Sequence, residues 1–420
     1  MKLLNFSWIR LKSILQKLKS SAAKSEKHLT RSQTKMKYNF DIIADRRSIN
    51  SMKWNVGQNE LPLWVADMDF DTAPEIKAAI MERAELGAYG YAETNSQWEE
   101  AYRSWWKSRY NFEIKREWLF FATGVVPLIS SSVRKITTPG ENVLLLTPTY
   151  NIFYNSILNN GRNPLECQLK FDGKEYKIDF EDLEEKLKDN QTSMMILCNP
   201  QNPVGKIWSR EELLKIGELC AENKVIVLSD EIHCDITEPG KLYIPFASIN
   251  ETCRNNCIMA IAPTKTFNLA GLSTAAAVIP DKTLRHKIWR GLNTDECGEP
   301  NAFSVQGAVS AFTKGKDWLE EARSYIWENR KLAEEFISSK IPSLNAIKSD
   351  ATYLMWIEIS ASKLDGKTFA KKLREKTGLY LSNGNQYGRG GENFVRMNLA
   401  TSRSIIEDAL NRLKEFCDSI

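Results

Sequence analysis

The order of apolar and amphipathic segments after residue 140 constrains the fold of this chain more than any other feature. Short apolar runs alternate with longer segments of helical periodicity, such as DFEDLEEKLKD and SREELLKIGELCAE. In the second of these, Ser209 precedes Glu212 by the spacing of a capping box, which marks a helix start. The alternation predicts an α/β fold with a mainly parallel central sheet sandwiched by helices. We expect its strands at 142–147, 193–198, 224–229, 256–262 and from 274 onward.

A change in character after residue 316 divides the sequence further. Long charged helical segments there precede the strand candidates TYLMWIEI and NFVRMNLA. We therefore expect a large α/β domain at 75–318 and a smaller α+β domain made of 37–74 and 319–420. Residues 1–36 form a basic extension, which we expect to be a disordered tail or the product of an upstream start. An interfacial helix and a transit peptide remain open alternatives for it.

Composition and charge exclude several classes of protein. The chain is 42% hydrophobic and 26% charged, and it has no apolar run near the ~20 residues of a membrane span. Its first 37 residues carry ten Lys or Arg against one acid, so a net charge of −5 remains for the other 383. Eight cysteines without metal-site spacing and three histidines predict no metal centre. We expect a cytoplasmic protein that binds neither nucleic acid nor membrane.

Polar motifs follow four of the predicted strands, in the order PTY, NPQNPVG, DEIH and PTKTFN. The carboxyl ends of parallel strands meet at one edge of a sheet, so these motifs should converge. Together they could hold pyridoxal phosphate, whose aldehyde bonds a lysine and whose ring nitrogen pairs with a carboxylate. Lys265 and Asp230 would serve these two roles, Asn202 or His233 would contact the phenolic oxygen, and Tyr150 would lie against the ring.

The phosphate of that cofactor needs a separate cradle. The backbone amides of ATGVVP at 122–127, just before the helical segment LISSSVRKI, are suited to bind it. The residues concerned are Gly124, Val125 and Val126. From the residues alone, the chain is predicted to carry out pyridoxal-phosphate chemistry at the α-carbon of an amino acid.

The order of NPQNPVG, SDEIH, APTKTFNLAGL and FVRMNLA resembles that of fold-type I pyridoxal-phosphate enzymes in the class I/II aminotransferase superfamily. Together with PLWVADMDF at 62–70 and YGY at 89–91, the DEIH and APTKTFNLAGL motifs are similar to those of the MalY/PatB group of cystathionine β-lyases, or C-S lyases. The likeness covers about residues 37–420. It implies an amino-acid substrate and a homodimer with shared active sites.

The same resemblance implies roles for individual residues. Lys265, Asp230, Asn202 and Tyr150 keep the roles given above. Arg396 would bind the substrate α-carboxylate, Tyr91 would reach the neighbouring subunit's site, and Gly124, Val125 and Thr264 would contact the phosphate. Two positions depart from many superfamily members: Ser273 stands where they have an arginine, and His233 where they have a tyrosine.

The activity that the resemblance implies is β-elimination from a cysteine-S-conjugate such as L-cystathionine. The products would be homocysteine or another thiol, pyruvate and ammonia. Two alternatives remain open: an aminotransferase for an apolar or aromatic amino acid, and a regulatory protein that acts through protein contact.

Overall fold

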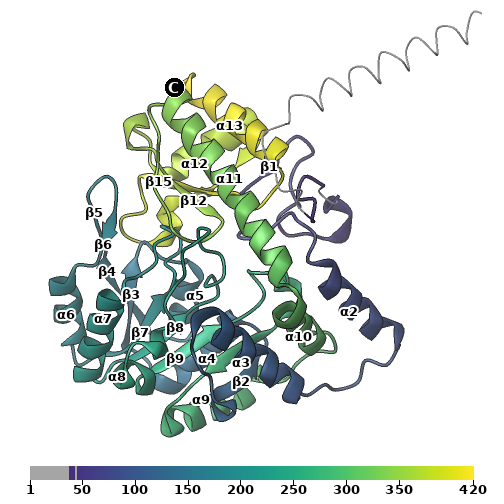
Figure 1. Ribbon diagram of the computed structural model, residues 1–420. Helices are drawn as coiled ribbons and strands as arrows, with labels where there is room; N and C mark the ends of the chain where they lie inside the picture. The colour runs from purple at the N-terminus through teal and green to yellow at the C-terminus, as the bar shows by residue number, and fades with distance from the viewer. Residues whose placement is uncertain (1–36, 43–44) are drawn as a thin grey trace, which may run out of the picture. The chain divides into compact units, whose positions relative to one another are not determined.

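The computed structural model describes residues 37–42 and 45–420 and contains a seven-stranded mixed sheet (Figure 1). The strand order is β2-β10-β9-β8-β7-β3-β4, and every neighbouring pair is parallel except the two that involve β10. The predicted α/β class and mainly parallel sheet are therefore confirmed. The strands are β2 Leu119–Ala122, β3 Asn142–Thr147, β4 Asn163–Gln168, β7 Thr192–Cys198, β8 Ile226–Asp230, β9 Cys257–Ile261 and β10 Ala275–Val278.

Helices cover both faces of this sheet because its central strands carry apolar side chains on both faces. On β7, Met194 and Ile196 belong to the core formed with helix α4, whereas Met195 contacts Cys220 of α7. Successive side chains of a strand point to opposite faces, so α4 and α7 lie on opposite sides. The helices between β1 and β10 are α2 Pro74–Glu85, α3 Ser96–Tyr110, α4 Val125–Ile136, α5 Ile152–Leu158, α6 Phe180–Leu187, α7 Arg210–Glu222 and α8 Glu251–Asn255.

A four-stranded antiparallel sheet of order β11-β12-β15-β14 forms from the last part of the chain. Its strands are β11 Asn345–Ala346, β12 Leu354–Glu358, β14 Ser382–Asn383 and β15 Phe394–Asn398. Two short ladders join β1 Leu61–Pro62 to β13 Leu379–Tyr380 and β5 Lys170–Phe171 to β6 Tyr176–Lys177. The later helices are α9 Lys282–Thr294, α10 Ser304–Lys314, α11 Lys316–Lys340, α12 Gly366–Thr377 and α13 Arg403–Cys417.

Most predicted boundaries differ from the observed ones by a few residues, and two of the differences have a clear local cause. The strand expected at 224–229 begins at Ile226, because Lys224 takes a left-handed conformation, with φ 60°, that ends the preceding turn. The helix expected from Leu128 begins at Val125, directly after Gly124. The capping box of Ser209 and Glu212 is present as predicted.

The expected basic extension at 1–36 lies outside the described residues. By its internal contacts the chain divides into two units, Met1–Asn39 and Phe40–Ile420, and the sheets and helices given above belong to the second. The division of that unit into two domains stays a prediction. No helix in the part of the chain that the structure describes combines the length and apolar character of a membrane span.

Candidate functional site

A cavity of about 200 Å³ lies where the predicted motifs meet, at the carboxyl ends of the central strands. Cys198 and Asp230 end neighbouring strands and are paired in register, and Tyr150 follows β3. All the residues predicted to bind the cofactor line this cavity, namely Gly124, Val125, Val126, Tyr150, Asn202, Asp230, His233, Thr264 and Lys265. The structure thus brings them together, whereas their individual roles stay predictions.

Lys265 lies in the loop that follows β9, and its ammonium reaches across to a different part of the chain. Its Nζ donates a hydrogen bond of 2.6 Å to the carbonyl oxygen of Ala66. Burial lowers the pKa of Lys265 from its ordinary value, although the carboxylates of Asp67 and Asp230 act in the opposite direction. An amine of lowered pKa is more readily deprotonated, which a nucleophilic lysine requires.

Asp230 is a buried carboxyl, 4% exposed, with few partners. Its Oδ1 accepts one hydrogen bond, of 3.1 Å, from the amide of Ile232. Burial raises the pKa of Asp230 to about 7, against the smaller effects of that amide and of Lys265. A cation that entered the cavity beside this carboxyl would restore its ionised form.

His233 and Tyr150 complete the walls around Asp230. Nδ1 of His233 is buried without a hydrogen-bond partner among the described residues. Burial, reinforced by the charges of Lys265 and Arg396, lowers the pKa of His233 to about 3, so the imidazole is neutral at physiological pH. Burial also raises the pKa of Tyr150 to about 12, so its ring is an uncharged surface of the cavity.

Arg396, at the centre of β15, lies against Asn202. Its Nη1 donates to Oδ1 of Asn202 at 3.1 Å, and its Nη2 donates to the carbonyl oxygen of Trp64 at 3.1 Å. The guanidinium carbon lies 4.9 Å from the ring centre of Tyr387. Nε is buried without a partner, and no carboxylate of the described residues lies within ion-pair distance. Arg396 therefore has an unpartnered donor and an uncompensated charge beside Asn202, which lines the cavity, whereas Arg396 itself is not among the lining residues.

The amino end of α4 closes the other end of the cavity. Gly124 precedes this helix with φ 147°, a conformation that favours glycine, and no side chain caps the helix. The amides of Val125 and Val126 are among the helix-starting groups that lack an intrahelical acceptor. Such amides and the helix dipole together favour an anion.

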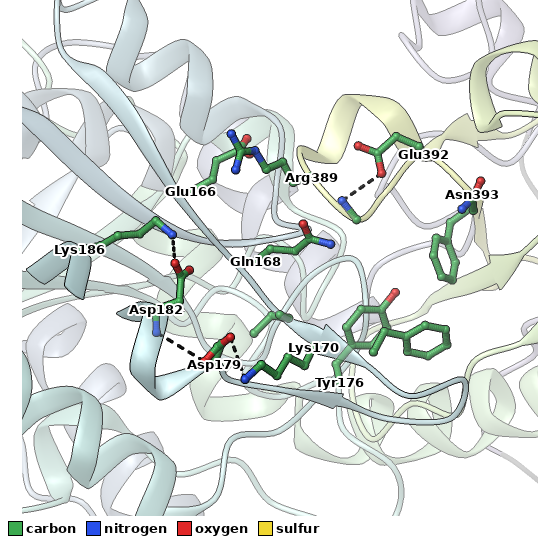
Figure 2. Close-up of a pocket in the computed structure, with 14 residues that line it drawn as sticks. Glu166, Gln168, Lys170, Tyr176, Asp179, Asp182, Lys186, Arg389, Glu392 and Asn393 are labelled. Atoms are coloured by element: carbon green, nitrogen blue, oxygen red, sulfur yellow. Dashed lines mark hydrogen bonds and ion pairs between the residues drawn. The ribbon is translucent and has the colours of Figure 1, made fainter. Parts of the chain in front are cut away.

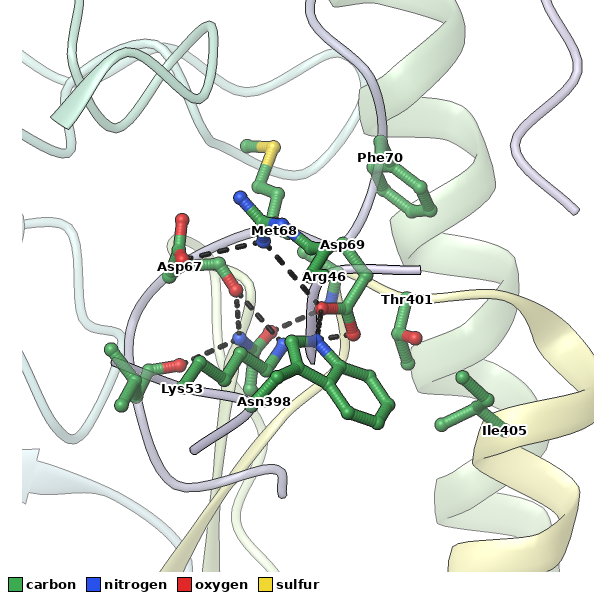
Figure 3. Close-up of polar contacts among 12 residues, drawn as sticks. Arg46, Lys53, Asp67, Met68, Asp69, Phe70, Asn398, Thr401 and Ile405 are labelled. Atoms are coloured by element: carbon green, nitrogen blue, oxygen red, sulfur yellow. Dashed lines mark hydrogen bonds and ion pairs between the residues drawn. The ribbon is translucent and has the colours of Figure 1, made fainter. Parts of the chain in front are cut away.

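The segment Leu63–Phe70 supplies a functional group that the sequence did not reveal, the carbonyl of Ala66. This segment is fixed by polar contacts on several sides (Figure 3). Nδ2 of Asn398 donates to the carbonyls of Val65 and Asp67, at 2.7 Å each. Nζ of Lys53 donates to the Asp67 carbonyl at 3.0 Å and pairs with the Asp69 carboxylate at 2.8 Å, with both side chains fully buried.

Tyr91 does not join the cavity of its own chain. It lies between α2 and α3 and is fully exposed. Tyr89 and Leu86 of the same loop are also exposed, as is Met81 on α2. This part of the surface therefore presents several large apolar side chains to solvent.

A larger cavity, of about 580 Å³, lies between β4, β5, α6 and residues 389–394 (Figure 2). Most of its charged side chains pair with one another, and the carboxylate of Glu392 accepts a hydrogen bond from the amide of Gly390. Lys170 is 2.8 Å from Asp179, Arg389 is 3.2 Å from Glu166, and Lys186 pairs with Asp182. Because these charges are already compensated, this cavity is a weaker candidate for binding an ionic ligand than the one around Lys265.

The sequence and fold of this chain are similar to those of known proteins. The aminotransferase class I and II family matches residues 54–413. Cystathionine beta-lyase PatB of Bacillus subtilis is 40% identical over 382 residues, which cover 90% of this chain and 99% of that protein. The predicted likeness to the MalY/PatB group is thereby confirmed.

Two solved structures resemble the fold closely. Cystalysin from Treponema denticola, which contains a pyridoxal 5'-phosphate cofactor, is 30% identical with a TM-score of 0.88, covering 91% of this chain and 100% of its own. The pyridoxal-phosphate-bound C-S lyase of Staphylococcus hominis is 32% identical with a TM-score of 0.85, covering 90% and 99%. The chain belongs to the aminotransferase class I and II family.

Proposed function

We propose that this chain is a pyridoxal-phosphate-dependent carbon-sulfur lyase. Its reaction would convert L-cystathionine and water into L-homocysteine, pyruvate and ammonia. The observation that carries the proposal is one cavity in which a lysine amine, a buried carboxyl with a single hydrogen-bond donor and an uncapped helix start meet. The likeness to cystathionine beta-lyase PatB and to the C-S lyase of Staphylococcus hominis supports elimination over transamination.

The groups that line the cavity fit the chemistry of pyridoxal phosphate. Nδ1 of His233, which has no hydrogen-bond partner among the described residues, and the carboxyl of Asp230 are buried polar groups. Their burial costs folding free energy unless a ligand forms hydrogen bonds with them. The amide groups at Val125 and Val126 suit a phosphate, and Asn202 keeps its Nδ2 as a donor because its oxygen is bound by Arg396. When bound, the cofactor supplies an acceptor for the electrons left at the α-carbon.

Each residue then has a physical task. Asp230 would keep the ring nitrogen protonated, since an ionised carboxylate favours an adjacent cation. Arg396 would bind the α-carboxylate of the amino acid with its free Nε and its uncompensated charge. Lys265, with its lowered pKa, would take the proton from the α-carbon, after which the thiolate leaves from the β-carbon.

The test combines absorbance with product analysis. The purified protein with pyridoxal phosphate should develop a visible absorbance band, and adding L-cystathionine without a keto acid should release pyruvate and free thiol. Lys265→Ala should abolish both the band and the release. A protein that is inert until a keto acid is added would instead be an aminotransferase, and one that never develops the band would overturn the proposal.

The proposed assembly is a cytoplasmic homodimer with shared active sites. Tyr91 is fully exposed and lies among other exposed apolar side chains, an arrangement suited to contact with a second subunit. All eight cysteines are free, which suits a reducing compartment. The proposed domains are 75–318, which holds Lys265 and Asp230, and the union of 37–74 with 319–420, which holds Arg396.

A further inference from the structure

Two buried carboxylates follow Asp230 in the chain, and they have different partners. Glu231 accepts hydrogen bonds of 2.9 Å from Ser229, Tyr243 and the amide of Phe246, all of which belong to the sheet and the loop after it. Asp235 is also fully buried, but it connects helix α3 to the loop that carries Lys265. Glu231 therefore serves the local fold, and Asp235 links distant elements.

One oxygen of Asp235 contacts three side chains of α3. Its Oδ1 accepts from Nε1 of Trp105 at 3.0 Å and from the hydroxyl of Tyr110, and it lies 3.0 Å from Nε of Arg109. The guanidinium supplies a counter-charge for the buried carboxylate. Two hydrogen-bond donors and one guanidinium on the same oxygen fix the orientation of the carboxylate group, so that its second oxygen faces away from α3.

That second oxygen, Oδ2, accepts a hydrogen bond of 3.1 Å from the hydroxyl of Thr266, the residue next to Lys265. Thr266 is fully buried. On the far side of the loop, Nδ2 of Asn268 donates to the carbonyl of Phe70 at 2.8 Å, and the ring of Phe267 packs edge-on against Trp105 at 5.9 Å. The backbone around Lys265 is thus tied to α3 on one side and to the segment 63–70 on the other.

We propose that Asp235 is a positioning residue for Lys265 and acts through the hydroxyl of Thr266. The inference rests on the proposed function, in which Lys265 bonds the cofactor. A hydrogen bond from a buried hydroxyl to a carboxylate is stronger than one between neutral groups. Without it the loop is free to shift, and small displacements of a reacting amine cost much of its rate.

The experiment uses the full chain and compares three threonine variants. Thr266→Val keeps the shape and removes the hydroxyl, whereas Thr266→Ser restores a hydroxyl. Thr137→Val is the matched control: Thr137 is also buried, donates to the Val133 carbonyl at 2.5 Å, accepts from Nε of Arg162 at 2.8 Å, and does not line the cavity. The measurements are the rate at which the visible band appears after mixing with pyridoxal phosphate, turnover, KM and melting temperature.

We expect Thr266→Val to slow band formation and turnover by about 10- to 100-fold while KM changes little, because the lysine and not the substrate site is displaced. Thr266→Ser should recover most of both rates. Asp235→Asn should lower both rates as well, and Thr137→Val should lower only the melting temperature. Equal band-formation rates in Thr266→Val, Thr137→Val and the wild type would overturn the positioning role alone. A wild-type chain that forms no band would overturn the proposed function and this inference with it.

Discussion

Replacing Asp230 by asparagine should stabilise the cofactor-free protein while impairing its reaction. Burial raises the pKa of this carboxyl from 3.8 to about 7. Each pKa unit corresponds to about 1.4 kcal/mol, so the ionised carboxylate costs the folded protein about 4 kcal/mol above pH 7. Asparagine has nearly the same shape and carries no charge, so the substitution removes this cost.

The pH dependence of the effect follows from linkage. Below about pH 4 the carboxyl is protonated in both the folded and the unfolded chain, and the substitution has little effect. Between pH 4 and 7 the unfolded chain releases the proton first, so the stability of the wild type falls relative to the variant. We expect Asp230→Asn to gain about 1.5 kcal/mol at pH 5 and up to about 4 kcal/mol at pH 8.

The assay is urea unfolding of both cofactor-free proteins at pH 5 and pH 8, followed by tryptophan fluorescence. Turnover should fall by up to about a thousandfold in the variant, because a carboxylate paired with a ring cation is worth ~4 kcal/mol at an effective dielectric near 20. A stability difference between the two proteins that is the same at both pH values would refute the reasoning.

Glu231→Gln is the matched control for this substitution. Burial also raises the pKa of Glu231 to about 7, but Glu231 has three hydrogen-bond donors and does not line the cavity. Its replacement should alter stability while leaving turnover close to that of the wild type. A comparable loss of turnover in Glu231→Gln would show that the effect of Asp230→Asn arises from disturbance of the strand end.

Three further outcomes test other parts of the site. Arg396→Lys should raise KM for the amino acid about tenfold or more, because the variant lacks the planar guanidinium and its unpartnered Nε. A smaller effect on KM than on kcat would contradict a role of Arg396 in binding the substrate carboxylate. Lys53→Met should lower the free energy of unfolding in urea by about 1–3 kcal/mol, because Asp69 loses its fully buried cation and retains Arg46 at 3.7 Å. An unchanged stability would contradict a stabilising role of the buried ion pair. Mixing inactive Lys265→Ala with Tyr91→Ala should restore part of the activity if subunits share sites, and mixtures that stay inactive would argue against Tyr91 in the partner's site.

Five of the seven strands of the central sheet and the cofactor-facing residues were predictable because their signals are local. A buried strand is a short apolar run, and the motif that follows it in the sequence lies at its carboxyl end in space. Asp230, Asn202 and Lys265 were found in this way, and all three line one cavity. The boundary errors at Ile226 and Val125 arose where a single backbone conformation, at Lys224 or Gly124, decides the start of an element.

Other parts of the site could not be predicted because they depend on tertiary contacts between distant segments. Ala66 contributes a main-chain carbonyl, for which the side chain gives no signal. The link from Trp105 through Asp235 to Thr266 joins residues that are 130 and 31 positions apart in the chain. Trp105 belongs to the buried aromatic face of α3. Its role as a hydrogen-bond donor to Asp235 required the fold.

The buried carboxylates differ in how many hydrogen-bond donors and cations they contact, and this difference is the strongest physical reason to treat the cavity as a binding site. Asp69 has a fully buried lysine and the indole of Trp54 as partners. Asp235 has three hydrogen-bond donors and the guanidinium of Arg109. Asp230 is buried to a similar degree, yet one backbone amide is its only hydrogen-bond donor among the described residues. Since the fold supplies counter-charges to the other two, the deficit at Asp230 is local to the cavity. A cationic ring nitrogen at this point would give Asp230 the counter-charge that Asp69 and Asp235 already have.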